Sequence, residues 1–118
     1  MTVSHYKGGC QCGAVTFEAD VDLDKTVACN CSRCRRLGSV LAFAPESDFH
    51  LISGEENLSE YLFNKKAIHH LFCKTCGIES FARAERPDGV RMIAVNANCL
   101  DGVDARALSP KHYDGASV

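Results

Sequence analysis

Cys29-Asn-Cys-Ser-Arg-Cys34 is the densest of three cysteine stretches that decide how this chain folds; the others are Gly8-Gly-Cys-Gln-Cys-Gly13 and Phe72-Cys-Lys-Thr-Cys-Gly77. Together they hold seven of the eight cysteines in 118 residues. Cysteines two or three residues apart have the spacing of metal ligands, because the turn between them brings both thiolates toward one ion. The sequence therefore predicts a zinc protein.

The composition is that of an ordinary globular protein. Hydrophobic residues make up 46% and charged residues 24%, which excludes a disordered or fibrous chain. Lys and Arg number 13 against 15 Asp and Glu, so there is no overall basic field that would attract nucleic acid or an anionic membrane. The length predicts a single zinc-binding domain over residues 1–118.

The compartment follows from what the sequence lacks. The segment Met1–Tyr6 has no basic region followed by an apolar one, and no stretch approaches the roughly 18 apolar residues of a membrane helix. We therefore expect a cytoplasmic protein without a membrane partner. A reducing cytoplasm disfavours disulfides, and CxC loops are geometrically awkward for a bridge, so metal binding is the favoured reason for so many thiols.

Short apolar segments separated by turn-forming groups indicate a mainly β fold. The expected strands are Ala14–Ala19, Val27–Cys29, Val40–Ala44, Phe49–Ile52, Tyr61–Phe63, Ile68–Phe72, Ser80–Ala84 and Val90–Val95. One short helical turn is expected at Ser32–Leu37, ending at Gly38 in the left-handed conformation. The polar segment Pro110–Val118 is expected to be poorly ordered.

Counting ligands divides the cysteines into two sites. A CxxCG knuckle supplies half a tetrahedral site, and a CxC pair is the obvious source of the other half. The first site would then consist of Cys10, Cys12, Cys73 and Cys76. The second would consist of Cys29, Cys31 and Cys34. The same count also allows Cys10 and Cys12 to pair with Cys29 and Cys31.

The two sites would differ in chemistry. A zinc site closed by four ligands is usually structural, whereas a catalytic site keeps one position open. The three thiolates of Cys29, Cys31 and Cys34 fit the catalytic description, and thiol chemistry suits them better than water activation. Cys99 could supply a fourth thiolate and close this site. Its alternative role is that of a buried small hydrophobe at the end of a strand.

Three arginines, Arg33, Arg35 and Arg36, crowd the second cysteine stretch. They could hold the carboxylates of an anionic thiol through charge-assisted hydrogen bonds. The alternative is a solvated helix face that offsets the thiolate charge, because three arginines within four residues point in several directions.

Two other polar groups accompany the cysteines. His69 and His70 would face opposite sides of a strand, so ordinary core or surface positions are favoured over a shared site. Asn96, Asn98 and Asp101 could hydrogen-bond metal ligands or substrate, although strand-end and turn roles are the commoner ones for these residue types.

The three cysteine stretches, in their order along the chain, resemble the glutathione-dependent formaldehyde-activating enzyme and centromere protein V family. The resemblance spans roughly Tyr6 to Asp101. It implies a β-tent fold of short antiparallel strands stapled by zinc, with two zinc ions per chain. The implied structural ion lies on the residues that match Cys10, Cys12, Cys73 and Cys76, and the second ion on Cys29, Cys31 and Cys34.

The resemblance also implies an activity. The named family reaction forms S-hydroxymethylglutathione from formaldehyde and glutathione, which is carbon–sulfur lyase chemistry. Our hypothesis is that a small-molecule thiol or its aldehyde adduct binds at the three-cysteine zinc, with its sulfur against the carbonyl carbon. The alternative is a non-enzymatic, zinc-stabilised binding module, since centromere protein V shows that the family is not confined to small-molecule enzymes. Closure of the second site by Cys99 would favour that module.

Overall fold

The structure, a computed structural model, describes residues 2–62 and 68–117, and its chain is mainly β as the sequence predicts. The strands are β1 (Ser4–Gly9), β2 (Thr16–Val21), β3 (Thr26–Cys29), β4 (Leu41–Pro45), β5 (Phe49–Ser53), β6 (Leu58–Tyr61), β7 (Ile68–Cys73), β8 (Phe81–Glu85), β9 (Arg91–Asn96) and β10 (Lys111–Tyr113). Among the described residues there is one short α-helix, α1 (Cys34–Leu37). No helix in the described residues is long and apolar enough to cross a membrane.

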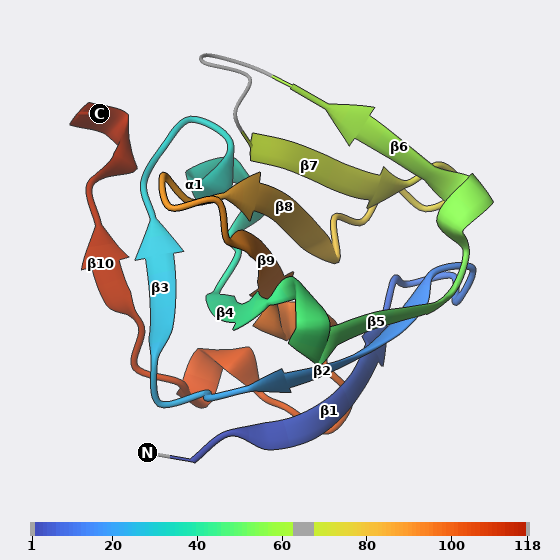
Figure 1. The fold of residues 1–118 in the computed structure, drawn as a ribbon, viewed down its shortest axis with the longest axis horizontal. Coiled ribbons are helices and arrows are strands. Elements are labelled where there is room, and N and C mark those ends of the chain that lie inside the picture. The colour runs from blue at the N-terminus through green and yellow to red at the C-terminus, as the bar shows by residue number, and fades with distance from the viewer. Residues whose placement is uncertain (1, 63–67, 118) are drawn as a thin grey trace.

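Two sheets face each other across the core. The smaller has the order β1-β2-β5, and the larger has the order β10-β3-β4-β9-β8-β7-β6. Figure 1 shows the smaller sheet crossing the lower part of the molecule, while the larger one curves round from β10 to β6. Strand pairs in the described chain are antiparallel, as predicted, except that β10 pairs with β3 in parallel.

Three aromatic rings join the sheets. Phe17 of β2, Phe49 of β5 and Phe81 of β8 meet with ring centroids 4.6 to 6.3 Å apart, and all three are buried. They face inward because side chains alternate along a strand, which gives β2 its alternating pattern of burial. Truncating one such ring to alanine typically costs about 3–5 kcal/mol of stability.

β1, β6 and β10 differ from the strands expected from the sequence. β1 has no counterpart among the expected strands, and its last residues are the pair Gly8 and Gly9. Gly8 belongs in this strand for a packing reason, since a Cβ there would meet the Phe17 ring and the Cys99 carbonyl oxygen. The strand predicted at Tyr61–Phe63 lies earlier, at β6, because pairing with β7 sets its register; Phe63 lies outside the described residues.

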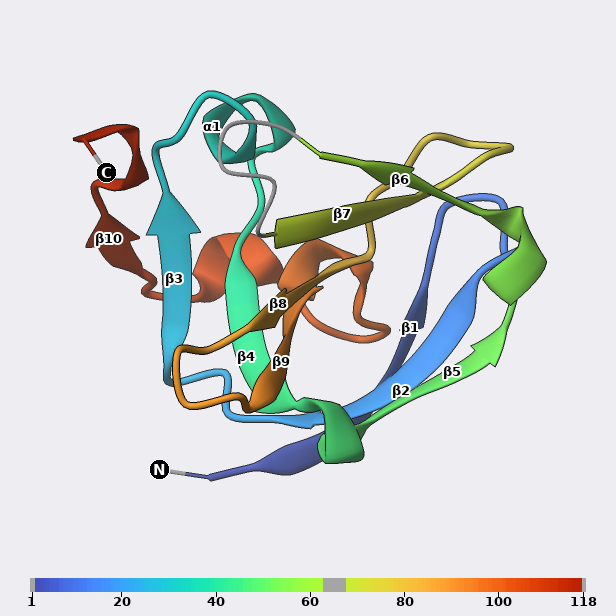
Figure 2. The same cartoon turned by 45° about the horizontal axis from the view of Figure 1, so that its top comes forward.

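The C-terminal segment is ordered, which corrects the prediction for Pro110–Val118 as far as residue 117. β10 extends the edge of the larger sheet beside β3, as Figures 1 and 2 both show. Asn30 fixes it: its amide donates to Asp114 Oδ1 at 3.0 Å, and its Oδ1 accepts from the Ala116 backbone N–H at 3.0 Å. The polar composition suggested disorder, but backbone pairing and one asparagine side chain supply the order.

Candidate metal centres

The first group of thiols, here the four-cysteine cluster, joins the two sheets. Cys10 and Cys12 follow β1 of the smaller sheet, whereas Cys73 ends β7 of the larger sheet and Cys76 follows it. Their four sulfurs lie within 4.8 Å of one another. Cys12 Sγ is 3.7 Å from Cys10 Sγ and 3.6 Å from Cys73 Sγ. These distances exclude a disulfide bond, which needs about 2.0 Å, and all eight cysteines are free.

Backbone turns aim N–H groups at the sulfurs of this cluster. The N–H groups of Val15 and Thr75 donate to Cys10 Sγ and Cys73 Sγ at 3.3 and 3.4 Å. The side-chain amide of Asn57 donates to Cys73 Sγ at 3.2 Å. Donors of this kind stabilise a thiolate rather than a thiol, so the site is built to carry negative charge.

The thiols of the four-cysteine cluster differ in acidity. The backbone N–H of Cys76, together with that of Thr75, lowers the pKa of Cys73 to about 6. The backbone N–H of Ala14 lowers the pKa of Cys12, but burial and the neighbouring sulfurs outweigh it and raise the pKa to about 11. One thiolate thus accepts hydrogen bonds from its neighbours, and a metal cation in their midst would take the place of those protons.

The second group, the three-cysteine cluster, comes from one local turn. Cys29 ends β3, Cys31 lies in the following turn and Cys34 begins α1; their sulfurs lie within 4.8 Å of one another. The turn aims the backbone N–H of Cys31 at Cys29 Sγ (3.4 Å) and that of Cys34 at Cys31 Sγ (3.3 Å). The helix ends as predicted at Gly38, whose φ of 67° is left-handed.

The acidities of two thiols in this cluster also diverge. Burial, helped by the neighbouring Cys31 and Cys29, raises the pKa of Cys34 to about 12. Burial also acts to raise the pKa of Cys31, but the backbone N–H groups of Cys34 and Arg33 and the Cys34 thiol outweigh it and lower that pKa. Cys34 therefore holds its proton more strongly than Cys31 does.

The C-terminal segment lies against the three-cysteine cluster. A Cβ on Gly115 would collide with Cys29 Sγ and would come within 3.5 Å of Cys31 Cβ. Asn30, which stands between these two cysteines, holds the segment in place through Asp114 and Ala116. The segment thus covers one side of the cluster with backbone.

Cys99 lies apart from the three-cysteine cluster. Burial raises the pKa of its thiol, and the charges of Cys10, Cys76 and Glu79 add to that shift. Among the described His, Cys, Asp and Glu residues, none joins Cys29, Cys31 and Cys34 as a fourth neighbour, and none joins the four-cysteine cluster as a fifth. The alternative pairing of Cys10 and Cys12 with Cys29 and Cys31 does not occur either.

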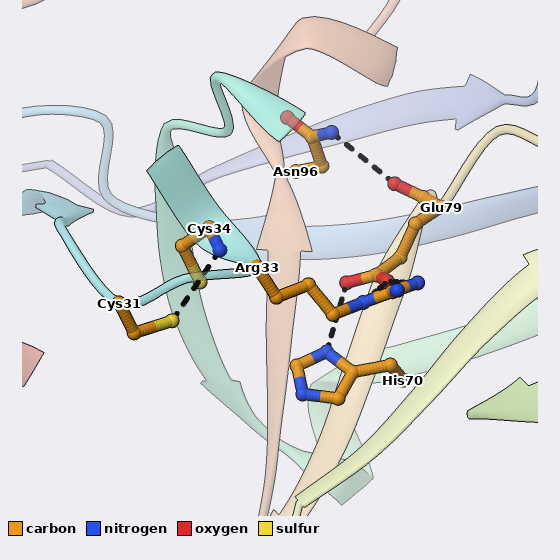
Figure 3. Close-up of polar contacts among 6 residues, drawn as sticks. All are labelled: Cys31, Arg33, Cys34, His70, Glu79 and Asn96. Carbon is orange, nitrogen blue, oxygen red and sulfur yellow. Dashed lines mark hydrogen bonds and ion pairs between the residues drawn. The ribbon is translucent and has the colours of Figure 1, made fainter. Parts of the chain in front are cut away.

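The buried carboxylate of Glu79, which bonds Arg33 of the three-cysteine loop, is not among the site residues expected from the sequence. Both Oε atoms of Glu79 are engaged: Oε1 accepts from Arg33 Nε and Nη2 at 2.9 and 2.6 Å, and Oε2 contacts His70 Nδ1 at 3.2 Å. The Glu79 carbonyl accepts from Asn96 Nδ2 at 3.2 Å. Figure 3 shows the Arg33 side chain reaching toward Glu79 and away from the sulfurs of Cys31 and Cys34.

The remaining candidates take ordinary positions. His70 is 4% exposed in the core, while His69 on the opposite face pairs with Glu60 at 3.0 Å. Asn98 donates to the Gly38 carbonyl at 3.1 Å and so fixes the end of α1. Asp101 donates its backbone N–H to the Lys7 carbonyl.

Two hollows flank α1, and Leu37 lines both. The first has a volume of about 460 Å³, and its described lining consists of Ser32, Arg33, Arg36, Leu37 and Tyr61. The second, of about 440 Å³, reaches Cys10 of the four-cysteine cluster and also includes Glu79, Asn96 and Cys99 in its wall.

Comparison with known proteins assigns the family. A family model described as glutathione-dependent formaldehyde-activating enzyme matches residues 5–114. The chain belongs to this family. A crystal structure of a Rhodobacter sphaeroides protein, a structural genomics target, is similar to it: the two are 37% identical, the match covers 90% of this chain and 97% of that one, and the TM-score is 0.79. The predicted membership of the formaldehyde-activating enzyme family and the predicted fold class are confirmed.

The two clusters are expected to differ in their effect on folding. Cys73→Ser should unfold the protein, because it removes a buried sulfur that joins the sheets and because structural metal binding is coupled to folding by roughly 10 kcal/mol or more. Cys34→Ser should leave the fold largely intact. Circular dichroism of the two variants, with Cys99→Ser as the control, makes the comparison. Equal loss of folded structure in the Cys73 and Cys34 variants would contradict the assignment of a structural role to the four-cysteine cluster alone.

The C-terminal segment is expected to slow metal loss from the three-cysteine cluster. Asn30→Ala removes both side-chain bonds to the segment, each worth about 1 kcal/mol net. A chelator should then withdraw one equivalent of metal about fivefold faster or more, while the second equivalent is unaffected. His5→Ala, which also removes two side-chain contacts but lies on β1, is the matched control. Equal release rates in both variants would show that the segment has no such role.

Proposed function

We propose that this chain is a zinc-dependent carbon–sulfur lyase that joins a glutathione-like thiol to formaldehyde. The observation that carries the proposal is the contrast between the clusters: four thiols meet in one, and three thiols without a fourth described ligand meet in the other. A complete tetrahedron suits a structural ion, and an incomplete one leaves a position for substrate.

The geometry supports zinc at the four-cysteine cluster. A zinc–sulfur distance of about 2.3 Å in a tetrahedron sets neighbouring sulfurs about 3.8 Å apart. The separations of Cys12 Sγ from Cys10 Sγ and Cys73 Sγ, 3.7 and 3.6 Å, are close to that value. Thiolate ligands also favour soft ions over calcium or magnesium. We assign one zinc ion to this cluster as a structural element and a second to Cys29, Cys31 and Cys34.

The three-cysteine cluster would supply the chemistry. A zinc ion held there would lower the pKa of an incoming thiol and keep its sulfur as a thiolate near neutral pH. The backbone N–H groups of Cys31 and Cys34 donate to the protein's own sulfurs and reduce the charge density on them. Gly115 and its neighbours exclude solvent from one side, which favours a defined approach of the substrate.

The proposed reaction is an addition. The substrate sulfur forms a bond to the carbonyl carbon of formaldehyde, and the electron pair of the C=O π bond moves onto the oxygen. That oxygen takes up a proton from water, which balances the proton that the thiol released to solvent. The reverse reaction breaks the carbon–sulfur bond, which gives the lyase its class. We place this reaction in the cytoplasm, where the thiols stay reduced.

A closed second site would favour the rival function, a binding module without chemistry. Cys99, the residue expected to close it, does not join the sulfurs of Cys29, Cys31 and Cys34. The described geometry therefore gives the module no specific support, and the membership of an enzyme-named family favours the lyase.

The activity is tested with purified zinc protein, glutathione and formaldehyde. NMR exchange spectroscopy should show that the protein accelerates interconversion of glutathione and S-hydroxymethylglutathione. Cys34→Ser should lose at least about tenfold of this acceleration, because one ligand of the incomplete site is gone. Cys99→Ser should retain it. An exchange rate equal to that in buffer would eliminate this substrate pair.

A further inference from the structure

The hollow beside α1 contains a guanidinium that the protein holds in one orientation. Glu79 bonds one edge of the Arg33 guanidinium through Nε and Nη2. The Tyr61 ring lies against its face, with Arg33 Cζ 4.6 Å from the ring centroid. The entropy of ordering a long side chain is thereby lost on folding rather than on ligand binding.

Glu79 acts as an anchor for this arrangement. Its side chain is only 8% exposed, and a buried carboxylate needs partners to offset its lost hydration. His70, 5% exposed, occupies the second oxygen, so Glu79 cannot rotate toward the hollow without breaking that contact. Two buried side chains therefore set the orientation of Arg33, and Figure 3 shows their contacts.

One edge of the guanidinium remains available. Within the part of the chain that the structure describes, Arg33 Nη1 has no hydrogen-bond partner, and Arg33 lines the hollow of about 460 Å³. Arg36 joins it in the wall, bent back over the helix by a 2.8 Å bond from its Nη1 to the Ser32 carbonyl. The two arginines carry two positive charges and Glu79 carries one negative charge, so the wall of the hollow has a net positive charge.

We propose that this hollow is a carboxylate-binding subsite for the thiol substrate, that Arg33 and Arg36 bind the carboxylate, and that Glu79 and His70 position Arg33. Guanidinium groups bind carboxylates by charge-assisted hydrogen bonds, the strongest kind available to a side chain on a protein surface. This inference rests on the proposed function for the identity of the ligand as a thiol. The carboxylate recognition itself does not depend on the reaction.

The position of the subsite selects a substrate class. Arg33 lies between Cys31 and Cys34 in sequence, but its side chain points away from their sulfurs. A thiol whose acid group is several bonds from its sulfur, as in glutathione, could occupy both places. A short or uncharged thiol would reach only the sulfur site.

The binding test uses S-methylglutathione, whose capped sulfur cannot form a thiolate, and its dimethyl ester, which lacks the free acids. Calorimetry or NMR titration of the zinc protein should show that the acid binds at least about tenfold more tightly than the ester. Arg36→Gln and Arg33→Gln should each remove most of this preference. Arg35→Gln is the matched control, since Arg35 is an arginine of the same helix that is absent from the hollow's described wall.

Glu79→Gln separates positioning from charge. The substitution keeps the shape of the side chain and makes the hollow more positive, so a purely electrostatic role predicts tighter binding of S-methylglutathione. The positioning role predicts weaker binding, by about fivefold or more, because Arg33 loses its charged anchor. In the exchange assay the KM for glutathione should rise in this variant while that for 2-mercaptoethanol stays unchanged. Circular dichroism and metal content verify that the variant is folded.

The outcomes separate this inference from the proposed function. Equal binding of acid and ester, or equal losses in the Arg35 and Arg36 variants, would overturn the subsite. Acceleration of adduct exchange with acidic and neutral thiols alike would also overturn the subsite, and the lyase would stand. If no thiol reacts faster than in buffer but S-methylglutathione binding still requires Arg36, the lyase fails and the subsite stands.

Discussion

The four sulfurs of Cys10, Cys12, Cys73 and Cys76 form the constraint on which the rest of the structure depends. Two come from the smaller sheet and two from the larger, and Cys12 and Cys73 are 61 positions apart in the sequence. Backbone N–H donors at Cys10 and Cys73 favour thiolates, whose mutual repulsion a cation would offset. A cation bound there would fix the sheets relative to each other at the end of β7, while the aromatic rings of Phe17, Phe49 and Phe81 hold them together in the core.

Glu79 links the segment around the four-cysteine cluster to the three-cysteine cluster. This residue follows Cys76 by three positions, and its partner His70 precedes Cys73 by three. Glu79 in turn bonds Arg33, which lies between two cysteines of the three-cysteine cluster. One buried carboxylate therefore connects the joint between the sheets to the loop with the proposed chemistry. The Asn30 contacts to the C-terminal segment hold that loop from the opposite end.

Features that arise from nearby residues could be predicted from the sequence. The turn chemistry around each cysteine pair, the end of α1 at Gly38 and most strands follow from local spacing and alternation. β1 could not be predicted in this way, because its two glycines interrupt the alternation of apolar and polar side chains. Gly8 is needed there because Phe17 and Cys99 approach its backbone closely, which only the folded chain reveals. The role of Glu79 could not be predicted either, since a single glutamate in a loop has no distinctive sequence pattern. Its role depends on contacts with Arg33 and His70 that form only in the folded chain. The order of the C-terminal segment likewise depends on pairing with β3.

The central claim is that the two clusters are unequal, one complete in sulfur and one with a position for a substrate thiol. X-ray absorption at the zinc edge of the protein with two bound ions measures this directly. The account predicts an average of about 3.5 sulfur ligands per zinc without substrate, rising to about 4 when glutathione is added. An average of about 4 sulfurs before any thiol is added, unchanged by glutathione, would contradict it.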